Sequence, residues 1–142
     1  MPIALDDICY NKAAIIERAL RRALEEYAMD SALENYTHID AMTLNIERAC
    51  QAAIDLAMHL VARDHLGSPQ SSADSFRLLQ AAGYIRPNTA LALSAMVGFR
   101  NVAVHEYQQM ELSILKKIGD SRWKDLVEYC RELGIEIRPG RK

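Results

Sequence analysis

The chain has 142 residues, of which 50% are hydrophobic and 25% are charged, and its formal net charge at pH 7 is −2. This length is enough for one domain with a buried core, over residues 1–142, and too short for two domains of ordinary size. The composition excludes an intrinsically disordered chain. Because the net charge is close to neutral, the chain as a whole has no positive field that would attract nucleic acid. Binding of nucleic acid would therefore require a local basic patch, which a dimer interface could build.

Cysteine usage and the N-terminal segment indicate a cytoplasmic protein. Cys9, Cys50 and Cys130 lie far apart within helical patterns, without the paired spacing of zinc ligands. We therefore expect buried free thiols in a reducing compartment, and neither a metal site nor a cofactor. Asp6 and Asp7 stand where a signal peptide carries basic residues, and no apolar run reaches the roughly 18 residues of a membrane span.

The first half of the chain predicts two long helices. From about Leu5 to Met29, apolar residues recur at spacings of three, four and seven, and charged residues fill the opposite face. Asp30 or Ser31 can cap a second helix, which continues without proline or glycine to about Leu66. Its broad stripe of apolar and small residues could serve a core and a dimer contact together.

The middle of the chain predicts a loop, a short helix and a bend. The segment SPQSSADSF is rich in serine and proline, and Asp74 or Ser72 can cap a helix that Gly83 ends. The residue before Pro87 avoids the α region, which predicts a bend. A further helix then begins at Asn88 or Thr89 and runs through LALSAMVGF into the motif that follows.

The C-terminal part predicts a short helix to Ile118, a break at Gly119 and Asp120, and a last helix from about Ser121 to Leu133. We expect residues 133–142 to form a flexible tail with a basic end. The expected buried face of the last helix comprises Trp123, Leu126, Val127 and Cys130, with Leu133 at its end. The whole pattern predicts an all-α fold, a four- to five-helix antiparallel bundle.

The stretch RNVAVHEY gathers Arg100, Asn101, His105 and Tyr107 directly after the apolar run. A hydrophobic core gains little from four polar or amphipathic residues in one short stretch, so this stretch is favoured as a functional site. In an unbroken helix, residues five apart are separated by about 140° around the axis. For Arg100 and His105 to act on one atom, therefore, either the helix loosens between them or a second subunit completes the site.

These residue types suit a phosphodiester. Arginine binds phosphate oxygens through a fixed fork of donors, and histidine exchanges protons near neutral pH. In RNA the 2′-hydroxyl is an internal nucleophile, so that a base, an acid and a cation suffice without a metal. One histidine per subunit supplies one proton role, and a symmetric dimer would supply both. Taken alone, the spacing is also compatible with Arg100 and His105 as ordinary surface or core hydrogen-bonding residues.

The motif and its surroundings resemble the HEPN superfamily and, within it, the HepT toxins of HepT/MntA toxin–antitoxin pairs. The resemblance lies in the Arg-x-x-x-x-His-x-Tyr pattern and in the segments NIERACQAAIDLAMHLVA, GSPQSSADSFRLLQAAGYI and MVGFRNVAVHEYQ, within residues 36–108. The outer ends are similar only in helical character.

This resemblance implies a homodimer with metal-independent endoribonuclease activity on RNA. Arg100 and His105 would be catalytic and Asn101 a polar accessory. Tyr107 would receive AMP from the cognate MNT-domain nucleotidyltransferase antitoxin, and the bulky anion would occupy the phosphate site. Two alternatives stay open: Tyr107 as a packing residue, and a non-catalytic HEPN-like module that binds nucleotide or docks a nucleotidyltransferase.

Other polar residues give weaker signals. His59, His65 and Asp64 lack a third metal ligand and are interpreted as surface or interface residues, and His38 with Asp40 lacks a partner. Basic residues that follow the motif could extend an electropositive cleft, but each taken singly is better explained by a solvated helix face; they are Lys116, Lys117, Arg122 and Lys124.

Overall fold

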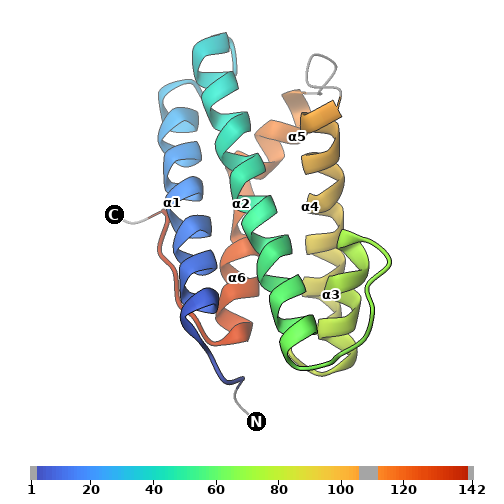
Figure 1. Cartoon of the computed structure of the whole chain (residues 1–142). Coiled ribbons are helices and arrows are strands. Elements are labelled where there is room, and N and C mark those ends of the chain that lie inside the picture. Colours follow the sequence, from blue (N-terminus) through green and yellow to red (C-terminus); the bar gives the residue numbers. More distant parts are fainter. Residues whose placement is uncertain (1–2, 106–111, 141–142) are drawn as a thin grey trace.

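The long helix α2 (Tyr36–Arg63) is the centre of the bundle, with α1 (Asp7–Met29) along one side and α3 (Ser72–Ala81) and α4 (Pro87–His105) along another (Figure 1). The structure is a computed structural model that describes residues 3–105 and 112–140, with the backbone alone for residues 100–105. Within those ranges it contains helices and no strand, which confirms the predicted all-α bundle. No described helix is long and apolar enough to cross a membrane.

Side-chain caps begin the first three helices. Asp6 accepts from the Cys9 amide at 2.9 Å, Asn35 from that of Thr37 at 2.8 Å, and Ser71 from that of Asp74 at 3.1 Å. Each cap satisfies an amide that the helix itself leaves unpaired. α4 instead begins at Pro87, whose missing amide hydrogen costs nothing in the first turn.

The second helix differs from its prediction at both ends. Asp30 does not cap it, because its carboxylate accepts from the amides of Glu34 and Asn35 in the preceding turn. At the other end the helix stops at Arg63, and His65 adopts a left-handed φ of 55°. The predicted cap of the short helix shifts similarly, from Ser72 or Asp74 to Ser71.

The predicted break at Gly119 and Asp120 is instead a π-helical turn. α5 (Leu112–Lys117) leads into the π-helix η2 (Ile118–Arg122), which leads directly into α6 (Trp123–Leu133). Gly119 allows this path, since a Cβ there would lie 2.6 Å from Cδ2 of Tyr27 in α1. Tyr27 also donates its hydroxyl hydrogen to Asp120 at 2.5 Å. Close packing against α1 thus fixes the turn where sequence alone indicated an interruption.

The segment expected as a flexible tail packs onto the bundle. Gly134 ends α6 with a φ of +106°, and Ile135 and Ile137 are both buried. The Arg138 amide donates to Glu17 at 2.8 Å, and Arg21 donates to the Arg138 carbonyl at 3.0 Å. Residues 135–138 therefore lie along α1, and they are held by burial and by hydrogen bonds at both backbone groups of Arg138.

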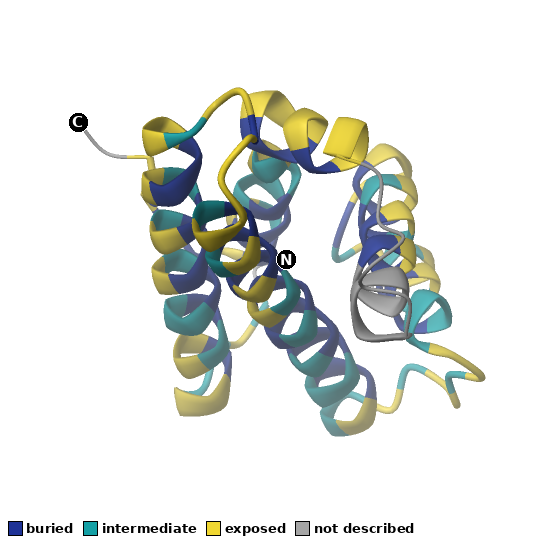
Figure 2. Cartoon of the chain, turned by 90° about the horizontal axis from the view of Figure 1, so that it is seen from above, coloured by how far each residue is buried: buried dark blue, intermediate teal, exposed yellow. Residues whose placement is uncertain are grey.

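The core lies between the inward faces of the helices, which Figure 2 shows as a buried interior with an exposed outer rim. The three cysteines are buried and free, as predicted. Burial raises the pKa of the Cys130 thiol to about 12, so this thiol stays protonated at neutral pH. In α6 the fully buried side chains include Leu126, Tyr129 and Cys130, whereas Trp123 and Val127 are partly buried against the core.

Candidate functional site

α4 carries positions 100, 101 and 105 of the motif on an unbroken helix. Its buried residues Leu93, Met96 and Phe99 anchor the helix to the core up to the residue before Arg100. The helix then continues through Arg100 and Asn101 and ends at His105. The loosening between Arg100 and His105 that the spacing allowed is absent from the described backbone.

The helical register separates the two central positions of the motif. Positions 100 and 105 lie about 140° apart around the axis of α4 and about 7.5 Å apart along it. Tyr107 lies outside the described residues. The described backbone therefore keeps these two positions on different sides of α4.

A pocket of about 500 Å³ lies beside the motif, between α4 and the run from α5 to α6. Met96 and Phe99 form part of its apolar wall, and Lys117, Arg122 and Asp125 contribute charged groups from the opposite side. All three charged residues come from the π-turn or its flanks. Such turns occur often at functional sites because they re-aim side chains within a helix.

The predicted basic cluster divides into two pairs. Lys117 and Arg122 line the pocket, and Arg122 Nη2 lies 2.9 Å from Asp125 Oδ2. Lys116 instead donates to the Tyr27 hydroxyl at 3.3 Å, and Lys124 lies 5.7 Å from the centre of the Trp123 ring. Two of the four basic residues therefore lie beside α4, and the other two make contacts elsewhere.

The comparison with protein families identifies the family to which the chain belongs. The family model described as ribonuclease HepT-like matches residues 14–133, which include Arg100, Asn101, His105 and Tyr107. The chain belongs to the HepT-like ribonuclease family. The match extends well beyond the resemblance over residues 36–108 and takes in the outer helices.

Individual HepT relatives are similar to this chain over nearly its whole length. The mRNA nuclease HepT of Shewanella oneidensis is 37% identical over 133 residues, which cover 93% of this chain and 100% of that protein. A toxin–antitoxin crystal structure with AMP-PNP is similar with a TM-score of 0.86 and 35% identity, over 90% of this chain and 98% of that one.

A second solved structure contains a nucleotide-modified HEPN toxin. It is a tri-AMPylated Shewanella oneidensis HEPN toxin in complex with an MNT antitoxin, with a TM-score of 0.85 and 35% identity. The similarity covers 91% of this chain and 98% of that chain. The HepT-like bundle is thus the fold of proteins that assemble with an antitoxin.

A cluster at the far end of this HepT-like bundle was not predicted. Ligand atoms of Asp6, Cys9 and His59 lie within 4.8 Å of one another, and Figure 1 places this end away from the end of α4. His59 Nε2 lies 2.8 Å from Asp6 Oδ2, and Arg63 donates to the same oxygen at 3.3 Å. The hydrogen bonds from the Cys9 amide and from His59 hold the pKa of Asp6 far below its usual range.

The contacts among Asp6, Cys9, His59 and Arg63 have a structural role. The carboxylate of Asp6 already accepts from two side chains and one amide, and burial raises the pKa of the Cys9 thiol. A metal would need the thiolate and would face the Arg63 cation. Only the fold reveals the cluster, because Asp6 and His59 lie 53 positions apart.

The structure corrects the interpretation of His38 and adds detail on Asp64 and His65. His38, predicted to lack a partner, lies with Nδ1 2.6 Å from Glu26 Oε1, and Glu26 is buried. Asp64 accepts from Arg63 and from the Tyr84 hydroxyl at 2.6 Å, which ties α2 to the segment before α4. His65 is exposed, as expected for a surface residue.

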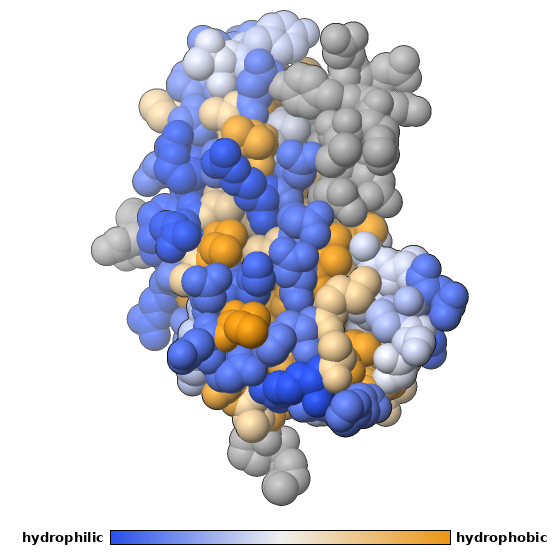
Figure 3. Space-filling model, viewed as in Figure 1, coloured by the Kyte–Doolittle hydropathy of each residue, from blue (hydrophilic) through white to orange (hydrophobic). Residues whose placement is uncertain are grey.

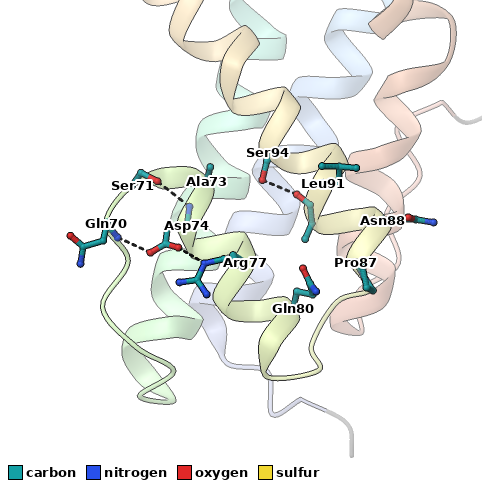
Figure 4. A pocket seen from close by; sticks show the side chains of 11 residues that line it. Gln70, Ser71, Ala73, Asp74, Arg77, Gln80, Pro87, Asn88, Leu91 and Ser94 are labelled. Atoms are coloured by element: carbon teal, nitrogen blue, oxygen red, sulfur yellow. Dashed lines mark hydrogen bonds and ion pairs between the residues drawn. The ribbon is translucent and has the colours of Figure 1, made fainter.

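A larger cavity of about 710 Å³ between α3 and α4 offers little chemistry (Figure 4). Asp74 accepts from Arg77 at 2.6 Å and from the Gln70 amide at 2.9 Å, so its charged groups satisfy one another. Its lining contains neither histidine nor cysteine among the described residues. The face over α1 and α2 in Figure 3 is mostly hydrophilic with scattered apolar spots.

Proposed function

We propose that this chain is the toxin of a HEPN/MNT toxin–antitoxin pair, an endoribonuclease that cleaves RNA with Arg100 and His105. The observation that carries the proposal is the HepT-like match over residues 14–133, with the complete Arg-x-x-x-x-His-x-Tyr pattern inside it. The 37% identity to an mRNA nuclease supports the same activity.

The chemistry assigns each motif residue a role. A base takes the proton of the 2′-hydroxyl as its oxygen attacks phosphorus, the bond to the 5′-oxygen breaks, and an acid protonates that oxygen. The products are a 2′,3′-cyclic phosphate and a 5′-hydroxyl, without a metal. His105 supplies the proton transfers and Arg100 binds the phosphoryl oxygens, while Asn101 is a polar accessory.

A homodimer accounts for both proton roles. One His105 acts as base and the His105 of a second copy acts as acid, across a two-fold axis. The unbroken α4 supports this arrangement, since positions 100 and 105 within one chain lie on different sides of the helix.

Modification of Tyr107 would silence the site. We propose that the cognate MNT-domain nucleotidyltransferase attaches AMP to Tyr107, two residues after His105. The tri-AMPylated relative in complex with its antitoxin supports this regulation. An attached nucleotide brings negative charge and bulk to the place where the substrate phosphate binds.

The test is cleavage of total cellular RNA by purified protein in excess chelator, with wild type beside His105→Ala. We expect the wild type to cut and to leave 2′,3′-cyclic phosphate ends, and the variant to be inactive. A folded, dimeric His105→Ala protein that cleaves at the wild-type rate would disprove the catalytic role. Loss of wild-type activity in chelator would disprove metal independence, provided that mass spectrometry finds Tyr107 unmodified.

A further inference from the structure

The central helix α2 carries a buried hydroxyl group that has no partner. Thr43 is 3% exposed, and its Oγ1 is buried and makes no hydrogen bond. A threonine hydroxyl within a helix often bonds to the carbonyl four residues earlier, which here belongs to Ile39. Few buried polar atoms in folded proteins lack a partner, and groups that serve a functional site are among the exceptions.

The register of α2 turns Thr43 away from α1. His59 and Arg63 of α2 both contact Asp6, which precedes α1. Around the axis of α2, Thr43 lies about 160° from both of these residues, and it shares a stripe with the buried Val61. α3 lies beside the last turns of α2, whereas α4 lies beside the part that carries Thr43 (Figure 1). The unpartnered hydroxyl is therefore on the α4 side of the helix.

Glu47 adds a carboxylate to the same side of α2. It follows Thr43 by four residues, which places it about 40° away around the axis and about 6 Å along it. Its side chain is half-buried and has no hydrogen bond or ion pair with a residue whose side chain the structure describes. Two acceptor groups without a partner thus lie within one turn of each other, next to α4.

Two hydrogen bonds through α6 relate the heights of α2 and α4 in the bundle. Thr89 of α4 donates to Glu132 at 2.7 Å, and Tyr129 donates to the Ala53 carbonyl of α2 at 2.9 Å. Tyr129 and Glu132 are three residues apart in α6, a rise of about 4.5 Å. Ala53 therefore lies about one turn beyond Thr89 in the direction of the motif.

Counting along the two helices from these anchors brings Glu47 level with the motif. Position 100 lies about 16 Å beyond Thr89 in α4, and Glu47 lies about 9 Å beyond Ala53 in the same direction. With the rise of about one turn between the anchors, the two positions agree in height to within roughly one turn. α2 and α4 contact each other, and the motif end of α4 lies beside the first half of α2 (Figure 1).

Position 100 also belongs to the buried stripe of α4. It follows Leu93 by seven residues, so that the two lie about 20° apart around the helix, and it follows Val97 by three. Leu93 and Val97 are both buried, and their stripe faces the interior of the bundle. An arginine at such a position requires acceptors from a neighbouring helix, because its guanidinium is always charged and has only donors.

We propose that Glu47 and Thr43 are positioning residues for the motif arginine. Glu47 accepts from one edge of the Arg100 guanidinium and Thr43 Oγ1 accepts a further N–H, so that the remaining donors are held toward the phosphate of RNA. The five N–H groups of arginine allow both sets of contacts, and an arginine that is already oriented loses less freedom when substrate binds. This inference rests on the proposed ribonuclease function and adds two residues outside the motif.

The first test compares Thr43→Val and Glu47→Gln with wild type in steady-state RNA cleavage. Valine keeps the shape of threonine without the hydroxyl, and glutamine keeps the shape of glutamate without the charge. We expect each change to lower kcat by roughly tenfold to a hundredfold, since the phosphate-binding group is no longer held in place, with KM nearly unchanged. Thr43→Ser keeps the hydroxyl and should keep the activity. An idle hydroxyl would instead give a Thr43→Val protein that is more stable and equally active.

Two matched controls separate positioning from general stability. Thr89→Val also removes a buried hydroxyl, but one that is paired with Glu132 at the other end of α4. We expect it to lower stability and to leave kcat unchanged. Asp55→Asn removes a carboxylate of α2 that pairs with Lys12 of α1 at 3.6 Å, and we expect it to leave kcat unchanged as well.

A second measurement does not depend on cleavage. In protein with isotope-labelled arginine, the Nε–H signal of Arg100 is identified by its loss in Arg100→Lys. We expect Thr43→Val and Glu47→Gln each to speed the exchange of this hydrogen with water by about tenfold, as a hydrogen bond to a charged group is lost. Asp55→Asn should leave the exchange unchanged. Because Glu47 is half-buried, Glu47→Gln gives this result even if Thr43→Val does not fold.

The outcomes separate this inference from the proposed function. If wild type cleaves RNA and both variants keep its kcat, the inference fails and the ribonuclease stands. If wild type cleaves no RNA, the ribonuclease fails, and exchange at Nε decides: faster exchange in the variants supports the positioning role, and unchanged exchange overturns it. Asp40 lies on the same stripe, seven residues before Glu47. An effect of Asp40→Asn without an effect of Glu47→Gln would also overturn the inference.

Discussion

The hydroxyl of Tyr129 donates to the backbone carbonyl of Ala53 at 2.9 Å, although the two residues lie 76 positions apart. This hydrogen bond joins α6 to the central helix α2. The ring of Tyr129 also meets that of Phe76 edge to face, with centroids 5.6 Å apart. One fully buried side chain therefore holds the last helix against the centre and against α3.

Tyr129→Phe removes only the hydroxyl from this contact. We expect a loss of about 1 kcal/mol in the free energy of unfolding, since the ring packing is kept and one buried hydrogen bond is lost. Urea denaturation measures the change. Tyr10→Phe is the control, because Tyr10 is 54% exposed and its hydroxyl stays with water; equal effects of the two changes would contradict a role for the buried bond.

Gly119→Ala tests the close packing of the π-turn. The added Cβ would meet the Tyr27 ring at 2.6 Å, so we expect a destabilisation of about 1–3 kcal/mol from overpacking. Gly98→Ala in α4 is the opposite case, with open space around the added atom and an expected gain of about 0.5–1 kcal/mol. Thermal denaturation of both variants checks the prediction, and a stabilised Gly119→Ala would refute it.

The pH dependence of stability reports on Asp64. Hydrogen bonds from Arg63 and then Tyr84 lower its pKa to about 2, from an ordinary 3.8. A carboxyl whose pKa is depressed by folding stabilises the folded state above its unfolded pKa, and this contribution is lost as the pH falls through the folded pKa. We expect the stability difference between wild type and Asp64→Asn to shrink from about pH 4 to about pH 2. Urea unfolding across that range measures it, with the exposed Asp7→Asn as control; a difference that is constant with pH would count against the assignment.

A mixed dimer tests whether both copies of His105 serve one site. Two differently tagged chains, one wild type and one His105→Ala, can be purified together. If base and acid come from different subunits, the mixed dimer should lose a hundredfold or more of the activity, as general acid–base catalysis contributes roughly 10²–10⁴. Half of the wild-type activity would instead show that each subunit works alone.

The sequence predicts the helices well because their apolar periodicity and caps are local. It locates the motif for the same reason, since all four polar residues lie within eight positions. It misses the Glu26 and His38 pair, the Asp6 and His59 pair and the packing of Ile135 and Ile137, because each depends on which helices become neighbours. It misses the pocket beside α4 for that reason too, as Asp125 and Phe99 share no local pattern.

The π-helical turn Ile118–Arg122 also makes this part of the chain tolerant of a change in length. A π-turn holds one more residue than the α-helical turn it replaces. Loss of a single residue within it would restore α-helical geometry and leave the residues that follow at nearly the same angle around the axis. Leu126, Tyr129 and Cys130, now fully buried, would then still face the core. A deletion within α6 itself would instead rotate everything that follows by about 100°, so a single-residue deletion should be better tolerated within the π-turn than at Lys124.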